Sequence, residues 1–481
     1  MNEEIKLTKI HDYLWEIPKT GQMRVPGRVY ASESMIRDIR KDKSLEQVIN
    51  VAYLPGIQKY SIAMPDIHLG YGFPIGGVAA MDAEDGVISP GGVGYDINCG
   101  VRLMRTHLIE EDVRPKLKEL VSELFHRVPC GFGSGGRIKL SKGDYKSLIE
   151  RGAKWAIEKG WGEAEDLERI ADHGTFHGGE PDAISEKAYE RGKDGLGTLG
   201  SGNHFLEADI VDRIYNPAVA DAFGLFKDQV CVQIHCGSRG FGHQTCTDYI
   251  NRMISYMRRE GINLPDKQLA CAHIKSKDGK DYLSAFAAAV NCAWTNRQII
   301  MASAREAFYN VFKIGPRELG GQLLYDVSHN IAKFEEHKVN GEVKKLCVHR
   351  KGATRAFPKG HPLVPEIYRK VGQPVLIPGD MGRASFILVG TEVALQETFG
   401  SSCHGAGRML SRNDAVRRGK GRDLFAELEG KGVVIMAKGK KTVLEEMPEA
   451  YKYVEDVCDV VHKAEIAKKV ARLRPIGVIK G

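Results

Sequence analysis

Short runs of β-branched and aliphatic residues, placed between segments with helical spacing, constrain the fold of this chain most. Runs so short and so apolar indicate strands that are buried in a sheet. They are Gln229–Ile234, Leu323–Val327, Lys344–Val348, Pro374–Ile377 and Gly432–Met436. Because such runs alternate with helical patterns, we predict a mixed α/β (or α+β) protein with a central β-sheet core flanked by helices.

Two segments carry a clear helical period. Glu111–Val128 has apolar residues at helical spacing, and Tyr282–Phe312 is a long, alanine-rich segment of the same kind. We find no internal repeat, low-complexity tract or Pro/Ser-rich linker in the 481 residues. Length alone suggests two or three domains, but without a linker we predict one large domain over residues 1–481.

Composition and charge indicate the cellular location of the protein more clearly than they indicate its function. The net charge of +7 suits a polyanionic partner, although many other proteins share it. The ten cysteines contain no CxxC pair, and the charged N-terminus lacks the apolar core of a signal peptide. We therefore expect a reducing, cytoplasmic location without a disulfide framework. No run approaches the roughly 18 apolar residues of a membrane span, so we expect no membrane association.

Several predicted strands end directly in polar residues with a glycine or another small residue nearby. The segments are His235–Gly240, Ser328–Asn330 and Pro378–Gly382. Loops that leave strand ends commonly present the chemistry of a rigid scaffold. For any one of these segments alone, a simple polar turn is the better interpretation.

Asp96 and Cys99 lie in an unusually glycine-rich segment and form a candidate metal site. Taken alone, the segment favours a buried cysteine beside a turn-forming aspartate. His204, His235 and His329 change that balance, because together with Asp96 and Cys99 they supply enough ligands for two cations that share the thiolate. Paired metals are a recurrent solution for chemistry at phosphorus, and the cleft that holds them is the predicted active site.

His404 is the candidate nucleophile. Its small neighbours let a bulky substrate approach the ring, and a neutral imidazole can attack phosphorus to form a covalent phosphoramidate. Gly405, Ala406 and Gly407 could offer backbone N–H groups to phosphate oxygens. Cys403 is a rival nucleophile, and a glycine-rich turn with a capping histidine is the structural alternative. No Walker A pattern and no KxDG motif is present.

Basic residues lie beside these segments in the sequence. Arg239, Lys351 and Arg412 are the candidates for RNA contact, since arginine suits bidentate binding of phosphate. A solvated positive face is the alternative, but the proximity of these residues to the proposed site favours polyanion binding.

Long motifs then identify a family. They occupy Met64–Gly77, Gly94–Arg102, Leu199–Phe205, His235–Gly240, His349–Ala356, Gly400–Arg408 and Arg474–Gly481. With these motifs the sequence closely resembles the RtcB family of RNA-splicing ligases over essentially its whole length. The resemblance implies an enzyme of tRNA splicing and RNA repair that uses GTP and manganese. It would join an RNA 3′-phosphate or 2′,3′-cyclic phosphate to a 5′-hydroxyl.

The resemblance also implies a sequence of intermediates and partners. His404 would carry GMP, which would pass to the RNA 3′-phosphate before the 5′-hydroxyl displaces it. RNA is the implied partner, archease a candidate activator, and we expect a monomer. Two rival hypotheses remain open, namely a metal-dependent phosphodiesterase that opens cyclic phosphates and a non-enzymatic protein that binds RNA ends.

By matching position, the resemblance implies that Asp96, Cys99 and His204 hold one manganese ion and that Cys99, His235 and His329 hold the other. The implied guanylate site is larger, with Glu207 and Lys480 at the guanine edge and Tyr451 stacked on the base. Its residues are Asn203, His204, Phe205, Leu206, Glu207, His329, Asn330, Pro378, Gly379, Asp380, Met381, Ser385, His404, Gly405, Ala406, Gly407, Tyr451 and Lys480.

The chain departs from the family's pattern at three positions. Asp380 replaces a more usual serine and Arg383 a more usual threonine in the nucleotide loop, and Cys236 replaces a more usual threonine. A carboxylate near phosphates is unfavourable unless it faces a metal ion or Arg383. The phosphate contact of this loop is therefore the least certain part of the prediction.

Overall fold

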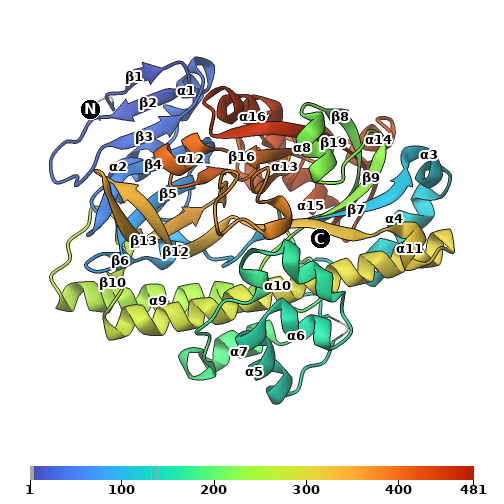
Figure 1. Ribbon diagram of the computed structural model, residues 1–481, viewed down its shortest axis with the longest axis horizontal. Coiled ribbons are helices and arrows are strands. Elements are labelled where there is room, and N and C mark those ends of the chain that lie inside the picture. The colour runs from blue at the N-terminus through green and yellow to red at the C-terminus, as the bar shows by residue number, and fades with distance from the viewer. Residues whose placement is uncertain (1–4, 132, 137) are drawn as a thin grey trace.

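A computed structural model describes residues 5–131, 133–136 and 138–481. Residues 1–4 lie outside these described ranges. They belong to the N-terminal segment in which we expect no signal peptide. A seven-stranded mixed sheet forms one part of the core (Figure 1), in the order β1-β2-β3-β4-β5-β13-β12. Its strands are β1 (Thr8–His11), β2 (Leu14–Ile17), β3 (Gly27–Tyr30), β4 (Ile57–His68), β5 (Ile75–Asp82), β13 (Glu342–Lys351) and β12 (Asn330–Val339).

An eight-stranded mixed sheet forms the other part, in the order β11-β7-β9-β8-β19-β16-β15, with β18 beside β19. Its strands are β11 (Gln322–Ser328), β7 (Gly100–Ile109), β9 (Gln229–Cys236), β8 (Phe205–Ile214), β19 (Ala467–Lys480), β16 (Ser385–Gly390), β15 (Pro374–Ile377) and β18 (Val434–Ala437). Two small sheets pair β6 (Val87–Ile88) with β10 (Ala272–His273) and β14 (Ala353–Arg355) with β17 (Ser401–Cys403).

Between β11 and β12, a single residue carries the chain from one large sheet to the other. β11 ends at Ser328 in the eight-stranded sheet, and β12 begins at Asn330 in the seven-stranded sheet. His329 therefore lies where the two sheets meet. One cluster of buried side chains draws on both sheets and on α16 (Val454–Lys463), so the sheets share a core.

Two long helices, α9 (Arg239–Arg259) and α10 (Lys277–Phe312), run side by side along the sheets, and α5, α6 and α7 pack on that pair (Figure 1). None of the described helices combines the length and apolarity that a membrane span requires. The remaining α-helices are α1 (Glu33–Ile39), α2 (Ser44–Val51), α3 (Glu110–Val113), α4 (Leu117–Arg127), α5 (Lys142–Arg151), α6 (Ala153–Glu158), α7 (Glu186–Gly192), α8 (Pro217–Ala222), α11 (Pro316–Leu319), α12 (Glu392–Glu397), α13 (Arg412–Arg418), α14 (Leu424–Glu429) and α15 (Lys440–Glu445).

The predicted α/β class is confirmed, and β15 has the predicted bounds. Two predicted elements need correction. The helix expected over Glu111–Val128 is interrupted by a 3₁₀ turn at Arg114–Lys116, where Pro115 lacks the N–H that a continuous helix needs. We expected the run Gly432–Met436 to be buried, but β18 is half-buried, since among the described strands it pairs with β19 alone and so lies at an edge.

Helix α10 begins five residues before the predicted Tyr282. Ser276 precedes its first turn, and the Ser276 hydroxyl accepts a hydrogen bond from the Gly279 N–H at 3.1 Å. This N-terminal cap satisfies one of the free N–H groups at the helix start. The apolar period could not locate the start, because the first turn is polar.

Candidate metal centre and nucleotide cavity

The register of the eight-stranded sheet brings the predicted ligands together. Gly100 at the start of β7 lies between Ser328 at the end of β11 and Cys236 at the end of β9. Phe205 at the start of β8 lies opposite His235. Because these neighbours are antiparallel, the start of one strand lies beside the end of the next. Residues just outside the strand ends therefore meet at one edge of the sheet.

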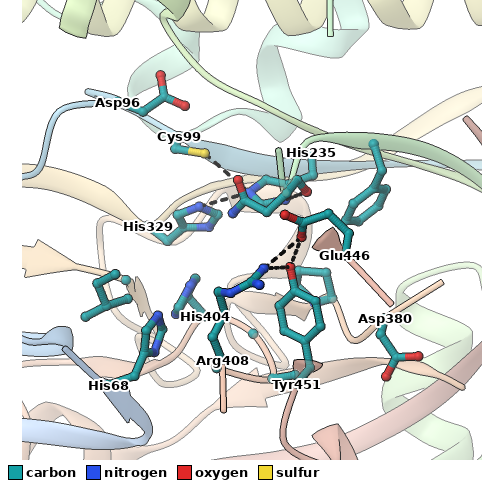
Figure 2. Close-up of a pocket in the computed structure, with 18 of the residues that line it drawn as sticks. His68, Asp96, Cys99, His235, His329, Asp380, His404, Arg408, Glu446 and Tyr451 are labelled. Atoms are coloured by element: carbon teal, nitrogen blue, oxygen red, sulfur yellow. Dashed lines mark hydrogen bonds and ion pairs between the residues drawn. The ribbon is translucent and has the colours of Figure 1, made fainter. Parts of the chain in front are cut away.

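All five predicted metal ligands lie at this edge. The Cys99 Sγ atom is 3.4 Å from His204 Nε2 and 3.3 Å from His235 Nε2. His235 Nε2 is 3.2 Å from His329 Nε2, and Asp96 Oδ2 is 2.9 Å from His204 Nε2. Figure 2 shows Cys99 and His329, each joined to His235 by a dashed line. The thiol thus lies between two histidines, as a shared ligand would.

A backbone carbonyl group fixes the tautomer of the His235 ring. His235 Nδ1 lies 3.1 Å from the Asn203 carbonyl oxygen. Since a carbonyl oxygen only accepts, we assign the proton of this ring to Nδ1, which leaves Nε2 with a lone pair for a metal ion. His204 Nδ1 lies 2.9 Å from the Leu199 carbonyl oxygen, and His204 Nε2 faces the Asp96 carboxylate at 2.9 Å. Either a proton or a bound cation between Nε2 and the carboxylate makes this contact favourable.

The electrostatics of the cluster also favour a cation. Burial holds the pKa of His235 and of His329 well below the ordinary value, which keeps both imidazoles neutral, the form that binds metals. Burial raises the pKa of the Cys99 thiol to about 12, and a bound metal ion would hold it as the thiolate. Burial lowers the pKa of His204, but the nearby Cys236 and Cys99 outweigh it and raise that pKa. The donor set fits a divalent transition metal.

A fully buried arginine on α10 supports the cluster from behind, and the sequence patterns did not reveal it. Arg297 Nη1 donates to the carbonyl oxygens of Asn98 at 2.7 Å and Cys236 at 2.8 Å. Its Nε and Nη2 atoms bind the Asp326 carboxylate at 2.9 and 2.8 Å. One guanidinium group therefore joins the segment before Cys99, the end of β9 and β11. Its position inside an alanine-rich helical pattern gave no signal of this role.

His404 is held by a carboxylate at the end of β4. Its Nδ1 atom lies 2.6 Å from Asp66 Oδ2, which also accepts from the backbone N–H groups of His404 at 2.9 Å and Gly405 at 3.2 Å. Burial opposes the charge on Asp66, but His404 outweighs it and lowers the Asp66 pKa. With the proton on Nδ1, the His404 Nε2 atom keeps a lone pair. The ring centroid is 4.9 Å from that of His329, which places the candidate nucleophile beside the candidate metal centre.

Asp66 is a site residue that the sequence analysis did not assign, although it lies within the motif Met64–Gly77. The usable signal was a carboxylate inside an otherwise apolar run, since such a group is rarely buried without a specific partner.

A cavity of about 430 Å³ adjoins the metal cluster and His404. Most of the predicted guanylate residues line it. These are Asn203, Phe205, Glu207, His329, Asn330, Pro378, Gly379, Asp380, Met381, His404, Gly405, Ala406, Gly407, Tyr451 and Lys480. The cavity thus joins the metal ligands to the proposed nucleotide contacts.

Three predicted guanylate residues do not line this cavity. His204 belongs to the metal cluster. The Leu206 side chain packs in the hydrophobic core, because side chains alternate along β8 and its neighbours Phe205 and Glu207 take the cavity face. Ser385 lies behind the nucleotide loop, where its hydroxyl accepts a hydrogen bond from the Gly379 N–H at 3.0 Å. Ser385 therefore supports the loop.

One end of the cavity has buried polar groups suited to a base. Burial and the neighbouring Asp209 raise the pKa of Glu207, and burial lowers the pKa of Lys480. A ligand that offers matched donors and acceptors would satisfy both groups. Nearby, Arg408 Nη1 donates to Glu446 at 3.2 Å and to the Tyr451 hydroxyl at 3.1 Å (Figure 2). This network fixes the Tyr451 ring at the cavity wall.

The unusual nucleotide loop neutralises its own carboxylate. Asp380 pairs with Arg383 and accepts a hydrogen bond from the Gly382 N–H at 3.1 Å. Arg383 also donates to the Tyr451 carbonyl oxygen at 3.1 Å. In Figure 2 Asp380 lies apart from the histidines. The two departures from the family pattern thus compensate one another, and the backbone of the loop still lines the cavity.

The structure separates the three predicted RNA contacts. Lys351 and Arg412 line the cavity. Lys351 is buried, and its ammonium group donates to the carbonyl oxygens of Tyr71 and Phe73, the latter at 3.1 Å. Arg239 lies outside the cavity lining, with Nη1 3.0 Å from His204 Nδ1. Arg412 is the only one of the three with a largely exposed side chain, at 57%.

Comparisons with known proteins agree with this geometry. Residues 47–481 match the family model described as tRNA-splicing ligase RtcB. The chain is 55% identical to the tRNA-splicing ligase RtcB of Thermococcus kodakarensis and 54% identical to that of Archaeoglobus fulgidus, over 100% of both chains in each case. It is 53% identical to the corresponding Pyrobaculum aerophilum protein over 99% of both chains.

Proposed function

The chain belongs to the RtcB family and is an RNA ligase, and we propose that it is a GTP- and manganese-dependent enzyme that joins RNA ends through His404. The RNA ends are a 3′-phosphate or 2′,3′-cyclic phosphate and a 5′-hydroxyl. Full-length similarity to tRNA-splicing ligases supports tRNA halves as a substrate, and RNA repair is the same reaction on other cleaved RNAs.

The observation that carries the proposal is the contact between His404 and Asp66. A buried carboxylate that holds Nδ1–H fixes the ring and raises the electron density at Nε2. The Nε2 atom is then the group able to attack phosphorus. The flanking Gly405 and Gly407 line the same cavity and leave room for a triphosphate.

We propose three displacements at phosphorus, in the order that the family resemblance implies. His404 Nε2 attacks the α-phosphorus of GTP, so that an N–P bond forms as the P–O bond to pyrophosphate breaks. An oxygen of the RNA 3′-phosphate then attacks that phosphorus, and the N–P bond breaks as GMP passes to the RNA. The RNA 5′-hydroxyl finally attacks the 3′-phosphorus, loses its proton and releases GMP. A cyclic phosphate would first be opened by water.

The proposed cofactors are two manganese ions. Asp96, Cys99 and His204 would hold one, and Cys99, His235 and His329 would hold the other. Bound cations would offset the negative charge that gathers around phosphorus in each displacement. Cavity residues from Asn203 to Lys480 would hold the guanylate, with Glu207 and Lys480 at the guanine edge.

The remaining assignments follow from the same proposal. RNA is the partner, archease is a candidate activator, and the enzyme works as a monomer of one domain in the cytoplasm. Arg412, at the cavity rim, is the favoured RNA contact of the three predicted. Lys351 and Arg239 act from closer to the protein interior.

A ligation assay separates this function from its rivals. Two RNA strands, one with a 2′,3′-cyclic phosphate or a 3′-phosphate and one with a 5′-hydroxyl, are incubated with manganese and with GTP, with ATP or without a nucleotide. If the protein is the proposed ligase, a joined product should form with GTP and should not form with ATP. A phosphodiesterase would open a cyclic phosphate without GTP and join nothing. A protein that only binds RNA ends would leave both strands unchanged, and either result would overturn the proposal.

A further inference from the structure

A second cavity, of about 300 Å³, lies behind one wall of the nucleotide cavity. Gly202, Glu445 and Gly481 line this second cavity, and their immediate chain neighbours line the nucleotide cavity. The two cavities are therefore lined by consecutive residues of the chain at three places. Arg412 lines both cavities, so its guanidinium group connects them.

The second cavity is bordered by cations. Lys438 lines it, and its Nζ atom donates to the neutral Ser134 hydroxyl at 2.9 Å. Within the residues that the structure describes, no carboxylate pairs with Lys438. A Cβ atom on Gly131 would lie 2.4 Å from the Lys438 Cδ atom, so glycine allows the lysine stem to lie against the backbone. Lys438 is therefore positioned beside the cavity and keeps an uncompensated charge.

The other charged groups do not cancel this positive character. Arg412 is more than half exposed, and its pair with Glu446 is long, at 3.7 Å. Two carboxylates also belong to the lining residues, that of Glu445, which pairs with Lys441 at 3.8 Å, and the terminal carboxylate of Gly481. With Glu445 paired, an anion in the second cavity would meet two cations, Lys438 and Arg412, against the one carboxylate of Gly481.

We infer that the second cavity binds a phosphodiester group of the RNA strand close to the reacting end, with Lys438 and Arg412 as its cationic contacts. This inference rests on the proposed RNA ligase function. Proteins that hold single strands guide the backbone along positively charged groups, and Arg412 lines both the second cavity and the cavity beside His404. The phosphates of GTP carry the same chemistry and are the alternative source of the anion.

The test compares Lys438→Gln with Lys280→Gln, which removes an exposed lysine on α10 outside both cavities. Ligation rates give the KM for the RNA strands, and covalent labelling with GTP gives the KM for the nucleotide. Loss of one phosphate contact should raise the RNA KM about three- to fivefold at low salt, and the difference should shrink as salt rises. The KM for GTP should match that of the control.

Three results decide the inference. Equal RNA KM values in the two variants would overturn it. A raised KM for GTP with an unchanged RNA KM would assign the cavity to the triphosphate and would also overturn it. If the unsubstituted protein does not ligate, the proposed function fails, and fluorescence anisotropy with 3′-phosphorylated RNA still tests the cavity. Weaker RNA binding by Lys438→Gln would then support the inference, and equal binding would contradict it.

Discussion

The metal end and the nucleotide end of the active-site cavity are built in different ways. The proposed metal ligands stand at strand ends of the eight-stranded sheet, and buried Arg297 supports them from α10. The nucleotide end consists of loops whose charged groups pair with one another, as Asp380 does with Arg383. At the metal end, side-chain nitrogen and sulfur atoms gather around one point, as Cys99 Sγ does with the Nε2 atoms of His204 and His235.

This difference indicates how far the structure of each end depends on its own ligand, the metal ions or the nucleotide. The ligand atoms of the metal end gather where a cation would join them, so its geometry and metal binding should fail together. The charged groups of the nucleotide loop pair with one another without a ligand, so changes at this end should alter GTP affinity and leave the fold and metal content intact. The predictions below test that contrast in order of decreasing effect.

The largest effect is expected from removal of the shared thiol. Cys99→Ala should reduce covalent labelling by GTP below detection, because both proposed cations lose a ligand. Cys271→Ala removes another buried thiol, one outside the cluster, and controls for the loss of packing. Bound metal is measured by mass spectrometry of the native protein. Full labelling by Cys99→Ala would contradict the shared-ligand arrangement.

A smaller loss is expected from Arg297→Met. It breaks a buried ion pair, at a cost of about 3–5 kcal/mol in the free energy of unfolding, and it also frees the segments that carry Cys99 and His235. We expect manganese affinity to fall about 10- to 100-fold.

Arg102→Met is the matched control for that variant. Arg102 is equally buried and pairs with the same Asp326 at 2.8 Å, but its other hydrogen bond goes to Gln298. Both variants should lose stability, whereas the loss of metal affinity should be larger in Arg297→Met. Equal metal affinities in the two variants would show that Arg297 acts only on stability.

Lys480→Met tests the nucleotide end. Loss of a buried cation at the guanine edge should raise the KM for GTP about 10- to 100-fold, with metal content equal to that of the unsubstituted protein. Titration of covalent labelling against GTP concentration gives the value. A loss of bound metal in this variant would remove the proposed contrast between the two ends.

The smallest effect is expected in the nucleotide loop. Arg383→Thr leaves the Asp380 carboxylate without its cation and should raise the KM for GTP severalfold, while Asp380→Ser should change it little. The double variant should return towards the original value, with a coupling of about 0.5–3 kcal/mol. Additive effects on KM would mean that the pair does not act as a unit.

Sequence patterns predicted the features that depend on residues close together in the chain. The bounds predicted for the strand at Pro374–Ile377 match the structure, and the candidate metal ligands drew attention because unusual donors follow apolar runs. Contacts across the fold were not visible. Asp66 and Arg297 act on segments more than 190 residues away in the chain, and neither periodicity nor composition reports which distant backbone a side chain will meet. Family resemblance supplied the ligand grouping, and the strand register explains how it is achieved.

The most direct test of the central claim is covalent labelling of His404. The protein is incubated with α-labelled GTP and manganese and is then separated under denaturing conditions. A phosphoramidate predicts label that is lost in acid, retained in alkali and absent from His404→Ala. Label that persists undiminished in His404→Ala, or no label on the unsubstituted protein, would contradict the account.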